Sequence, residues 1–243
     1  MVIETFALLL FAHLLGDFTL QTNSMAMNKK RLDVLALHVL IITVLSFLAI
    51  GQFAWKLLGI VALTHFLIDL IKARNGGSGF TWFAADQCAH LGVLVAVSVL
   101  LPIDAGQSLH LGLLEPATRS FVLQIVIQAS GLILCVTVGA YVTGLAVKPF
   151  TDEIGNALQG LKDGGRIIGQ LERFMVFVFT VSGNPTGIGF LIAAKSILRF
   201  GDITNPDQRK VAEYVIIGSF ISFAWAITVS HLTILASSHI GPG

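Results

Sequence analysis

The sequence predicts an all-α protein, a polytopic bundle of transmembrane helices with about six to eight membrane segments. Two features of its composition indicate a membrane protein. Of the 243 residues, 55% are hydrophobic and only 12% are charged, whereas about 25% of the residues of a soluble protein are charged. The mean hydropathy is +0.84. The third observation is the length of the apolar stretches, because about 20 apolar residues are needed to cross a bilayer core of about 30 Å.

Six stretches have the length and composition of complete spans. They lie at 3–22, 33–50, 54–73, 82–101, 121–147 and 209–235. Glu4 stands where a secretory signal peptide carries basic residues, and no small-residue cleavage pattern follows the first stretch. We therefore expect this stretch to remain in the mature protein as a membrane span.

A seventh apolar segment, 167–200, is interrupted by the turn signal Ser-Gly-Asn-Pro at 182–185. Its two arms are short and fit either two tilted spans or a re-entrant hairpin. The amphipathic segment 148–170 precedes it and is expected to form a connector on the cytoplasmic side. The chain is thereby divided into a His/Asp-rich transmembrane part at 1–147, the connector, and a C-terminal transmembrane part at 171–243.

The distribution of basic residues predicts the orientation. Basic residues follow the first, third and fifth spans and precede the last one. Alternating spans place all four groups on the same side, provided that 167–200 enters the membrane and returns to that side. The positive-inside rule makes that side cytoplasmic and places both termini outside. We therefore expect a multi-pass protein of the cell inner membrane, in contact with membrane lipids. A net charge of +1 and the lack of a basic run longer than 29–31 argue against nucleic-acid binding. Homo-oligomerisation stays open.

Ionisable side chains recur at helical spacing inside four consecutive predicted spans. In three of these spans a histidine and an aspartate stand four residues apart, which places both on one helix face. The pairs are His13 with Asp17, His65 with Asp69, and Asp86 with His90, and the second span adds His38. At 1.5 Å per residue, the three paired histidines lie about 10–14 Å from the cytoplasmic edge, and the other four groups about 5–8 Å. Because ionisable groups are costly inside a membrane, the cluster indicates a functional site that opens to the cytoplasmic side.

The chemistry of these side chains favours a metal site. Imidazole and carboxylate groups are the ligands that Zn²⁺ and other divalent transition metals use. We predict a divalent transition metal, with zinc as the first choice, bound by His13, His65 and His90, with His38 as a fourth ligand. The carboxylates of Asp17, Asp69 and Asp86 are the predicted catalytic groups, as further ligands, as orienting groups or as a general base.

Two other interpretations of the cluster stay open. It could join the helices as a polar network, although interhelical polar contacts contribute only about 0.6 kcal/mol on average. It could also be a proton relay or an ion-coupling site. Lys72, one helical turn beyond Asp69, is expected to extend toward the lipid headgroups and not toward the cluster.

A second polar set lies in the back part of the chain, in the cytoplasmic half of its segments. Buried charges generally pair with each other, so we expect structural ion pairs between its acidic and basic members. The alternative is a cationic pocket that binds an anionic group such as a phosphate or a lipid headgroup. The members of this set are Glu172, Arg173, Lys195, Arg199 and Glu213.

Three motifs of the front part have a distinctive spacing of polar residues: AHLLGDFTLQT, THFLIDLIKAR and ADQCAHL. They resemble the bacterial family called domain of unknown function 3307. In the back part, LERFMVFVF, GFLIAAKSILRF and AEYVIIGSFISFAWA are similar to a segment of its longer members. This resemblance implies a polytopic inner-membrane protein and supplies no activity. The His/Asp layout is also similar to that of membrane-embedded metal hydrolases of the ceramidase-like superfamily, although the order of the motifs differs.

The sequence thus predicts an integral membrane protein with a buried His/Asp site. The leading interpretation is a metal-dependent, membrane-embedded hydrolase that acts on a lipid-linked or amphipathic substrate from the cytoplasmic side. The alternative is an ion- or proton-coupled transporter or channel, because interrupted helices such as 167–200 commonly build transport sites. A non-catalytic membrane anchor or sensor is the third interpretation.

Overall fold

The computed structural model describes residues 1–76, 79–154, 163–197 and 206–240. These residues form helices and their connections, and no strand occurs among them. Five helical segments of this described part are long and apolar enough to cross a membrane. They are Val2–Leu20, Leu32–Ile50, Phe80–Leu100, Pro116–Thr151 and Arg209–Ser238. The predicted class, an all-α transmembrane bundle, is confirmed.

The number of strongly apolar helices is somewhat lower than the six to eight segments expected. The predicted span at 54–73 is a helix, Trp55–Arg74, but it carries several charged side chains and does not belong to the five. In the interrupted segment, the helix Gly164–Val181 contains three charged residues and Pro185–Ile197 has only 13 residues. These three segments are helical, but each is too charged or too short to count among the strongly apolar helices, which explains the lower number.

The chain forms two compact units. The front unit comprises Met1–Ser130 together with the chain end from Ala236, and the back unit comprises Gly131–Leu235. The helices of the front unit are α1 (Val2–Leu14), η1 (Leu15–Leu20), α2 (Asn23–Met27), α3 (Leu32–Ile50), α4 (Trp55–Arg74), α5 (Phe80–Leu100), η2 (Ala105–Gln107), η3 (Leu111–Leu113) and most of α6 (Pro116–Ile133).

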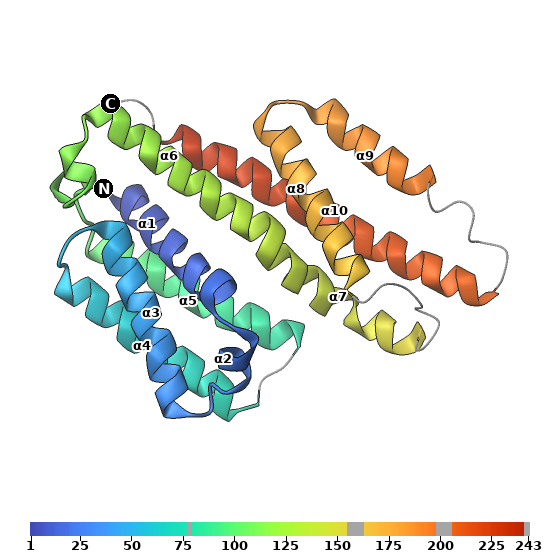
Figure 1. Cartoon of the computed structure of the whole chain (residues 1–243), viewed down its shortest axis with the longest axis horizontal. Helices are drawn as coiled ribbons and strands as arrows, with labels where there is room; N and C mark the ends of the chain where they lie inside the picture. Colours follow the sequence, from blue (N-terminus) through green and yellow to red (C-terminus); the bar gives the residue numbers. More distant parts are fainter. Residues whose placement is uncertain (77–78, 155–162, 198–205, 241–243) are drawn as a thin grey trace. The chain divides into compact units, whose positions relative to one another are not determined.

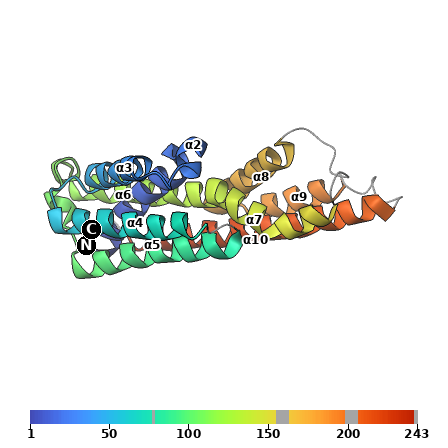
Figure 2. The ribbon, with the colours of Figure 1, turned by 90° about the horizontal axis from the view of Figure 1, so that it is seen from below.

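Four helices of the front unit form a closed ring. Helix α1 packs against α3 and α5, and α4 packs against the same two helices, so each helix has two neighbours in the ring (Figures 1 and 2). Aliphatic side chains such as Leu9, Ile42, Leu57 and Leu94 fill part of the interior. The remainder of the interior receives the polar side chains of the same four helices. This arrangement places residues from four separate spans around one centre.

The turn between α3 and α4 explains how two of these helices become antiparallel neighbours. Helix α3 ends at Gly51, whose φ of 61° lies in the left-handed region that glycine adopts without steric cost. Helix α4 begins at Trp55, after a connection of a few residues. A short connection of this kind returns the chain alongside the helix that it has left.

Helix α1 continues into η1, a π-helical segment. A π-helical turn is wider than an α-helical turn, so it changes the direction of the side chains along η1, including that of Asp17. Segments of this type are frequent at functional sites. Gly16, beside Asp17, packs directly on α3, because a Cβ atom at this position would collide with the Ile42 side chain. The absence of a side chain at Gly16 therefore lets η1 approach α3 closely.

The back unit consists of the end of α6, η4 (Leu134–Val138), α7 (Gly139–Ile154), α8 (Gly164–Val181), α9 (Pro185–Ile197) and α10 (Pro206–Ser238) as far as Leu235. Helices α8 and α9 form a hairpin with its turn at the predicted interruption, where Gly183 has a φ of 68° (Figure 1). Of the predicted connector, 148–154 belongs to α7 and 164–170 to α8, and 155–162 lies outside the described residues.

Candidate metal centre

The ring of α1, α3, α4 and α5 brings the predicted histidines and aspartates together. The side chain of Asp17 is 7% exposed, and none of the other six residues exceeds that value. Helix α1 with η1 contributes His13 and Asp17, α3 contributes His38, α4 contributes His65 and Asp69, and α5 contributes Asp86 and His90. All seven residues come from spacings of four within a helix, except His38, which has no such partner.

Three atoms of this cluster form a small triangle. His38 Nε2 lies 3.0 Å from Asp17 Oδ1 and 3.1 Å from His65 Nε2. The third side, from His65 Nε2 to Asp17 Oδ1, is 3.4 Å long. In a tetrahedral zinc site with bonds of about 2.0–2.1 Å, neighbouring ligand atoms lie about 3.3–3.4 Å apart. The triangle therefore has nearly the dimensions of one face of such a site.

The hydrogen bonding within the triangle is incomplete. Asp17 Oδ1 is buried and makes no hydrogen bond of acceptable geometry, although an imidazole nitrogen lies 3.0 Å away. The contact between His38 Nε2 and His65 Nε2 requires that one of the two nitrogens carries the proton. A cation on the open side of the triangle would replace this proton and would supply the partner that the carboxylate oxygen lacks. The donor set and its spacing thus fit a divalent transition metal.

Asp69 faces two parts of the cluster at once. Its Oδ2 lies 3.4 Å from His38 Nε2 and 3.5 Å from His65 Nε2, next to the triangle. Its Oδ1 lies 4.0 Å from His90 Nε2. Asp69, Asp86 and His90 form a second group whose ligand atoms lie within 4.8 Å of one another. The Asp69 carboxylate is therefore placed as a bridge between two ligand groups.

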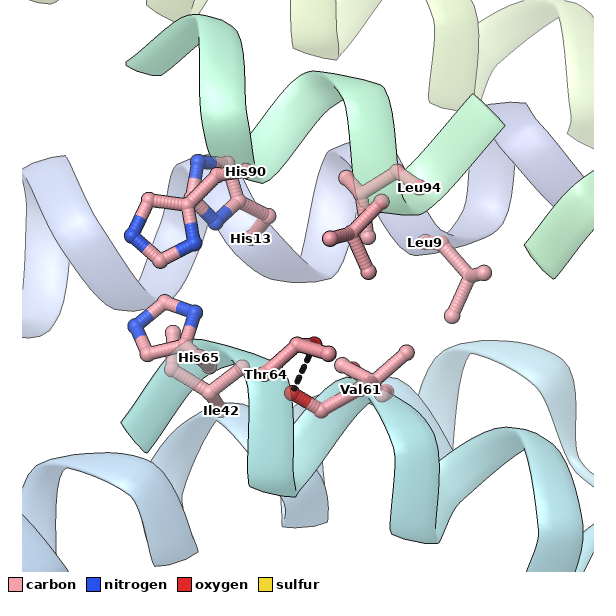
Figure 3. Close-up of a pocket in the computed structure, with 10 residues that line it drawn as sticks. Leu9, His13, Ile42, Val61, Thr64, His65, His90 and Leu94 are labelled. Carbon is pink, nitrogen blue, oxygen red and sulfur yellow. Dashed lines mark hydrogen bonds between the residues drawn. The ribbon is translucent and has the colours of Figure 1, made fainter. Parts of the chain in front are cut away.

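The three histidines predicted as the main ligands also lie together. Ligand atoms of His13, His65 and His90 are within 4.8 Å of one another, and the rings of His65 and His90 are 4.1 Å apart between centroids (Figure 3). His13 Nε2 lies 3.3 Å from Gln87 Oε1, an amide contact that orients the imidazole. His90 Nε2 and Asp86 Oδ1 are buried without a hydrogen-bond partner among the described residues.

Two lysines supply positive charge to this site. Lys72 Nζ donates to Asp86 Oδ2 at 2.7 Å, so the expectation that Lys72 points to the headgroups is wrong. Lys29, expected only as one of the basic residues that set the orientation, donates to Asp69 Oδ2 at 2.8 Å. The signal that could have found both is the excess of buried carboxylates, since buried charges require countercharges.

The next basic residue, Arg31, does not take part in the cluster. It donates two hydrogen bonds to Asp33 at the exposed start of α3. These hydrogen bonds raise the pKa of the Arg31 guanidinium above its usual value. Of the basic run at 29–31, Lys29 alone has an ion pair with a site residue among the described residues.

The cluster has different surroundings on its two sides. On one side, Asp69 lines an open cavity of about 300 Å³ together with Lys29 and Lys72. On the other side, the three imidazoles border a space of only about 10 Å³, which is enclosed by aliphatic side chains such as Leu9 and Leu94 (Figure 3). A volume of this size holds no more than about one water molecule. The site is therefore accessible from one side and closed by an apolar floor on the other.

The described members of the back unit's polar set have partners: Glu172, Lys195 and Glu213 form ion pairs, and Arg173 donates to uncharged acceptors. Glu172 Oε2 accepts a hydrogen bond from Lys195 Nζ at 2.6 Å across the α8–α9 hairpin. Arg173 donates to Ser222 Oγ at 2.9 Å and to the Val136 carbonyl at 3.2 Å, which satisfies a carbonyl of the π-helical segment η4. Glu213 forms an exposed pair with Arg209 at 3.0 Å. The remaining predicted member, Arg199, lies outside the described residues.

Residues 5–114 match the model of a family described as a protein of unknown function (DUF3307). The resemblance of the three front motifs to this family is confirmed, and the motifs of the back part lie outside the matched residues. The DUF3307 segment contains all seven histidines and aspartates of the cluster as well as Lys29 and Lys72, and it ends before α6. No curated protein and no solved structure matches the chain.

Proposed function

We propose that the protein is a membrane-embedded, metal-dependent hydrolase with its metal site in the front unit. The observation that carries this proposal is the triangle of Asp17 Oδ1, His38 Nε2 and His65 Nε2, with edges of 3.0, 3.1 and 3.4 Å and one oxygen without a hydrogen bond. Asp69 Oδ2, close to both imidazoles, is the fourth candidate ligand. A divalent ion there would supply Lewis-acid polarisation of a scissile bond and a water molecule of lowered pKa.

The residues around the triangle have separate roles in this proposal. The Oδ2 atom of Asp86 is held by Lys72 at 2.7 Å and by the Gln87 amide at 3.0 Å. Its Oδ1 atom makes no hydrogen bond and lies 3.8 Å from His90 Nε2. Asp86 Oδ1 is therefore the candidate general base, and it can pass a proton to the neighbouring imidazole.

The one-sided access of the site favours a hydrolase over a transporter. A transport pathway opens to the two sides of a membrane in turn, so transport would require a second state in which the aliphatic floor of Leu9, Val61 and Leu94 is displaced. A hydrolase needs only one opening, and the cavity at Asp69 supplies it. Exclusion of water on the other side would also strengthen the electrostatic interactions in the site.

The second candidate is a proton- or ion-coupled transporter, and one observation favours it. The imidazoles of His38, His65 and His90 form a row: the Nε2 atoms of His38 and His65 lie 3.1 Å apart, a distance suited to proton transfer, and the His90 ring lies beside that of His65 with 4.1 Å between the centroids. For transport, the aliphatic floor would have to open during the cycle. A non-catalytic membrane anchor or sensor requires neither the row nor the cavity.

Metal analysis of the purified, detergent-solubilised protein tests the proposal. We expect at least one equivalent of a divalent transition metal per chain in the wild type and less than a tenth of it in His38→Ala and His65→Ala. His231→Ala, which changes a histidine of the back unit outside the cluster, is the matched control and should retain the metal. A wild-type protein without bound metal after purification in chelator-free buffer and zinc supplementation would overturn the proposal.

A second experiment separates the hydrolase from the transporter. Turnover of amphiphilic ester and phosphoester substrates should be lost on metal chelation and in Asp86→Asn, because the candidate base is then removed. Proteoliposomes should show no cation flux above that of protein-free vesicles. If Asp69→Asn abolishes a measurable flux and no hydrolysis is found, the transporter replaces the hydrolase.

A further inference from the structure

The open cavity beside the cluster has the charge of an anion-binding site. It is lined by Gln21, Lys29, Lys30, Asp69 and Lys72, which we call the lysine pocket, and by four small or apolar residues. Lys29 is paired with Asp69 and Lys72 with Asp86, which leaves the positive charge of Lys30 without an acidic partner in the described part of the chain. Its volume of about 300 Å³ is at the lower end of ligand pockets, which span about 300–1,000 Å³. The pocket can therefore hold a headgroup rather than a whole lipid.

The hydrogen-bonding capacity of the lysine pocket is only partly used. Lys29 and Lys72 each donate one short hydrogen bond to a carboxylate, and an ammonium group has three donors. Lys30 is exposed and forms no ion pair with an acidic residue in the described part of the chain. The amide oxygen of Gln21 is buried and has no hydrogen-bond partner there. Unused donors converge with an unused acceptor, which suits a phosphate group that bears or adjoins a hydroxyl.

The position of the lysine pocket relates it to the lipid headgroups. Gln21 directly follows η1, and Lys72 lies in the last turn of α4, so the pocket is formed at the ends of membrane helices. The side chain of Met27 lines the same pocket and is 77% exposed, and Ala26 and Ala73 complete an apolar rim. Cationic groups with an adjoining apolar rim fit a molecule that joins an anionic head to an aliphatic chain.

We propose that the lysine pocket binds the phosphate group of an amphiphilic substrate, and this assignment rests on the hydrolase proposed above. The pocket shares Asp69 with the metal-ligand cluster, whose Oδ2 lies 3.4 Å from His38 Nε2. A phosphate held by Lys29, Lys30 and Lys72 would thus lie next to the proposed metal site. The substrate class is a phosphate-bearing amphiphile, and Lys30 is a residue that positions it.

Binding experiments on the full-length protein in detergent test this proposal with three probes: phosphatidic acid with two eight-carbon chains, inorganic phosphate, and the matching diacylglycerol. The phosphatidic acid should bind at least tenfold more tightly than either of the other two. Lys30→Ala should weaken its binding about five- to tenfold and Lys30→Glu more, because a charge-assisted hydrogen bond is lost. Lys56→Ala, an exposed lysine at the other end of α4, is the matched control and should bind as the wild type does.

The possible outcomes test the lysine pocket and the metal-dependent hydrolase independently of each other. Equal binding of phosphatidic acid by the wild type and Lys30→Glu would overturn the lysine pocket, even if the protein contains stoichiometric metal. Equal affinity for inorganic phosphate would overturn the assignment to an amphiphile, and Met27→Ser, which alters only the apolar rim, should weaken the lipid and not the phosphate. Lys30-dependent binding by a protein that contains no metal would support the pocket and overturn the hydrolase.

Discussion

The two units of the molecule bury polar side chains in different ways. In the back unit, Glu172 and Lys195 form one direct ion pair, and Arg173 donates hydrogen bonds to a hydroxyl and to a backbone carbonyl. In the front unit, seven ionisable side chains converge from four helices, and several of their buried oxygen and nitrogen atoms have no hydrogen bond.

The difference offers a criterion for distinguishing a structural network from a binding site. Where buried charges serve packing, each group finds a partner, because an unpaired buried polar group costs about 1–3 kcal/mol. Asp17 Oδ1, Asp86 Oδ1 and His90 Nε2 violate this rule within one small volume. In the back unit the single unpaired atom of the ion network in the described part is Arg173 Nε. The front unit thus retains binding capacity that the back unit uses for its own stability.

The largest effect is expected from Arg173→Met in the back unit. This change leaves the Ser222 hydroxyl and the Val136 carbonyl without their donor, and we expect a loss of about 2–4 kcal/mol in the free energy of unfolding. Thermal unfolding in detergent measures it. Arg209→Ala, which breaks an exposed pair with Glu213, is the control and should change stability by less than about 0.5 kcal/mol. If Arg173→Met unfolds at the same temperature as the wild type, the buried polar groups of the back unit do not serve its stability, and the distinction between the two units is wrong.

A somewhat smaller effect is expected from zinc on the front unit. A ligand that binds only the folded state stabilises it by about 2.7 kcal/mol at a concentration 100-fold above its dissociation constant. Zinc should therefore raise the unfolding temperature of the wild type and of Lys195→Ala, and chelation should reverse this. His38→Ala should show no zinc-dependent shift. A shift in His38→Ala equal to that of the wild type would place the zinc outside the triangle.

A coupling of about 1 kcal/mol is expected between Glu172 and Lys195. The pair is close, but the Lys195 side chain is 23% exposed, so solvent screening reduces its contribution. A double-mutant cycle with Glu172→Gln and Lys195→Met measures the coupling through thermal unfolding. Additive effects of the two substitutions would show that the pair contributes nothing to the stability of the α8–α9 hairpin.

The smallest effect on stability is expected from Asp17→Asn in the presence of a chelator. Because Asp17 Oδ1 makes no hydrogen bond of acceptable geometry and the amide keeps the shape of the side chain, the substitution should lower the free energy of unfolding by no more than about 0.5 kcal/mol. The same variant should lose zinc binding. A destabilisation as large as that of Arg173→Met would identify Asp17 as a structural residue.

The helices and the composition of the cluster could be predicted because both depend on spacing along the chain. Residues such as His65 and Asp69 are four apart and must share a face of any helix that contains them. The apolar stretches fix the helices within a few residues of their observed bounds, for example 33–50 against Leu32–Ile50. Local periodicity was sufficient for these features.

Other parts of the site depend on contacts between distant residues. His38 has no polar neighbour one turn away, and its central position follows from the packing of α3 against η1 at Gly16. Lys29 reaches Asp69 across 40 positions of sequence from the connection before α3. The π-helical register of η1 also leaves no signature in the hydrophobic pattern. None of these features is encoded in a spacing within one helix.

The polarity of α4 has a consequence for the biogenesis of the protein. A charged residue at the centre of a membrane helix raises the cost of insertion by about 2.5–3.5 kcal/mol, and one nearer the end costs less. Helix α4 carries His65 and, toward its end, Asp69 and Lys72. Its apolar residues do not offset these groups as well as those of α3 and α5 do. Helix α4 should therefore enter the bilayer together with its neighbours, whose acidic and imidazole side chains contact the polar side chains of α4. Insertion of the helix and assembly of the polar cluster then become a single event.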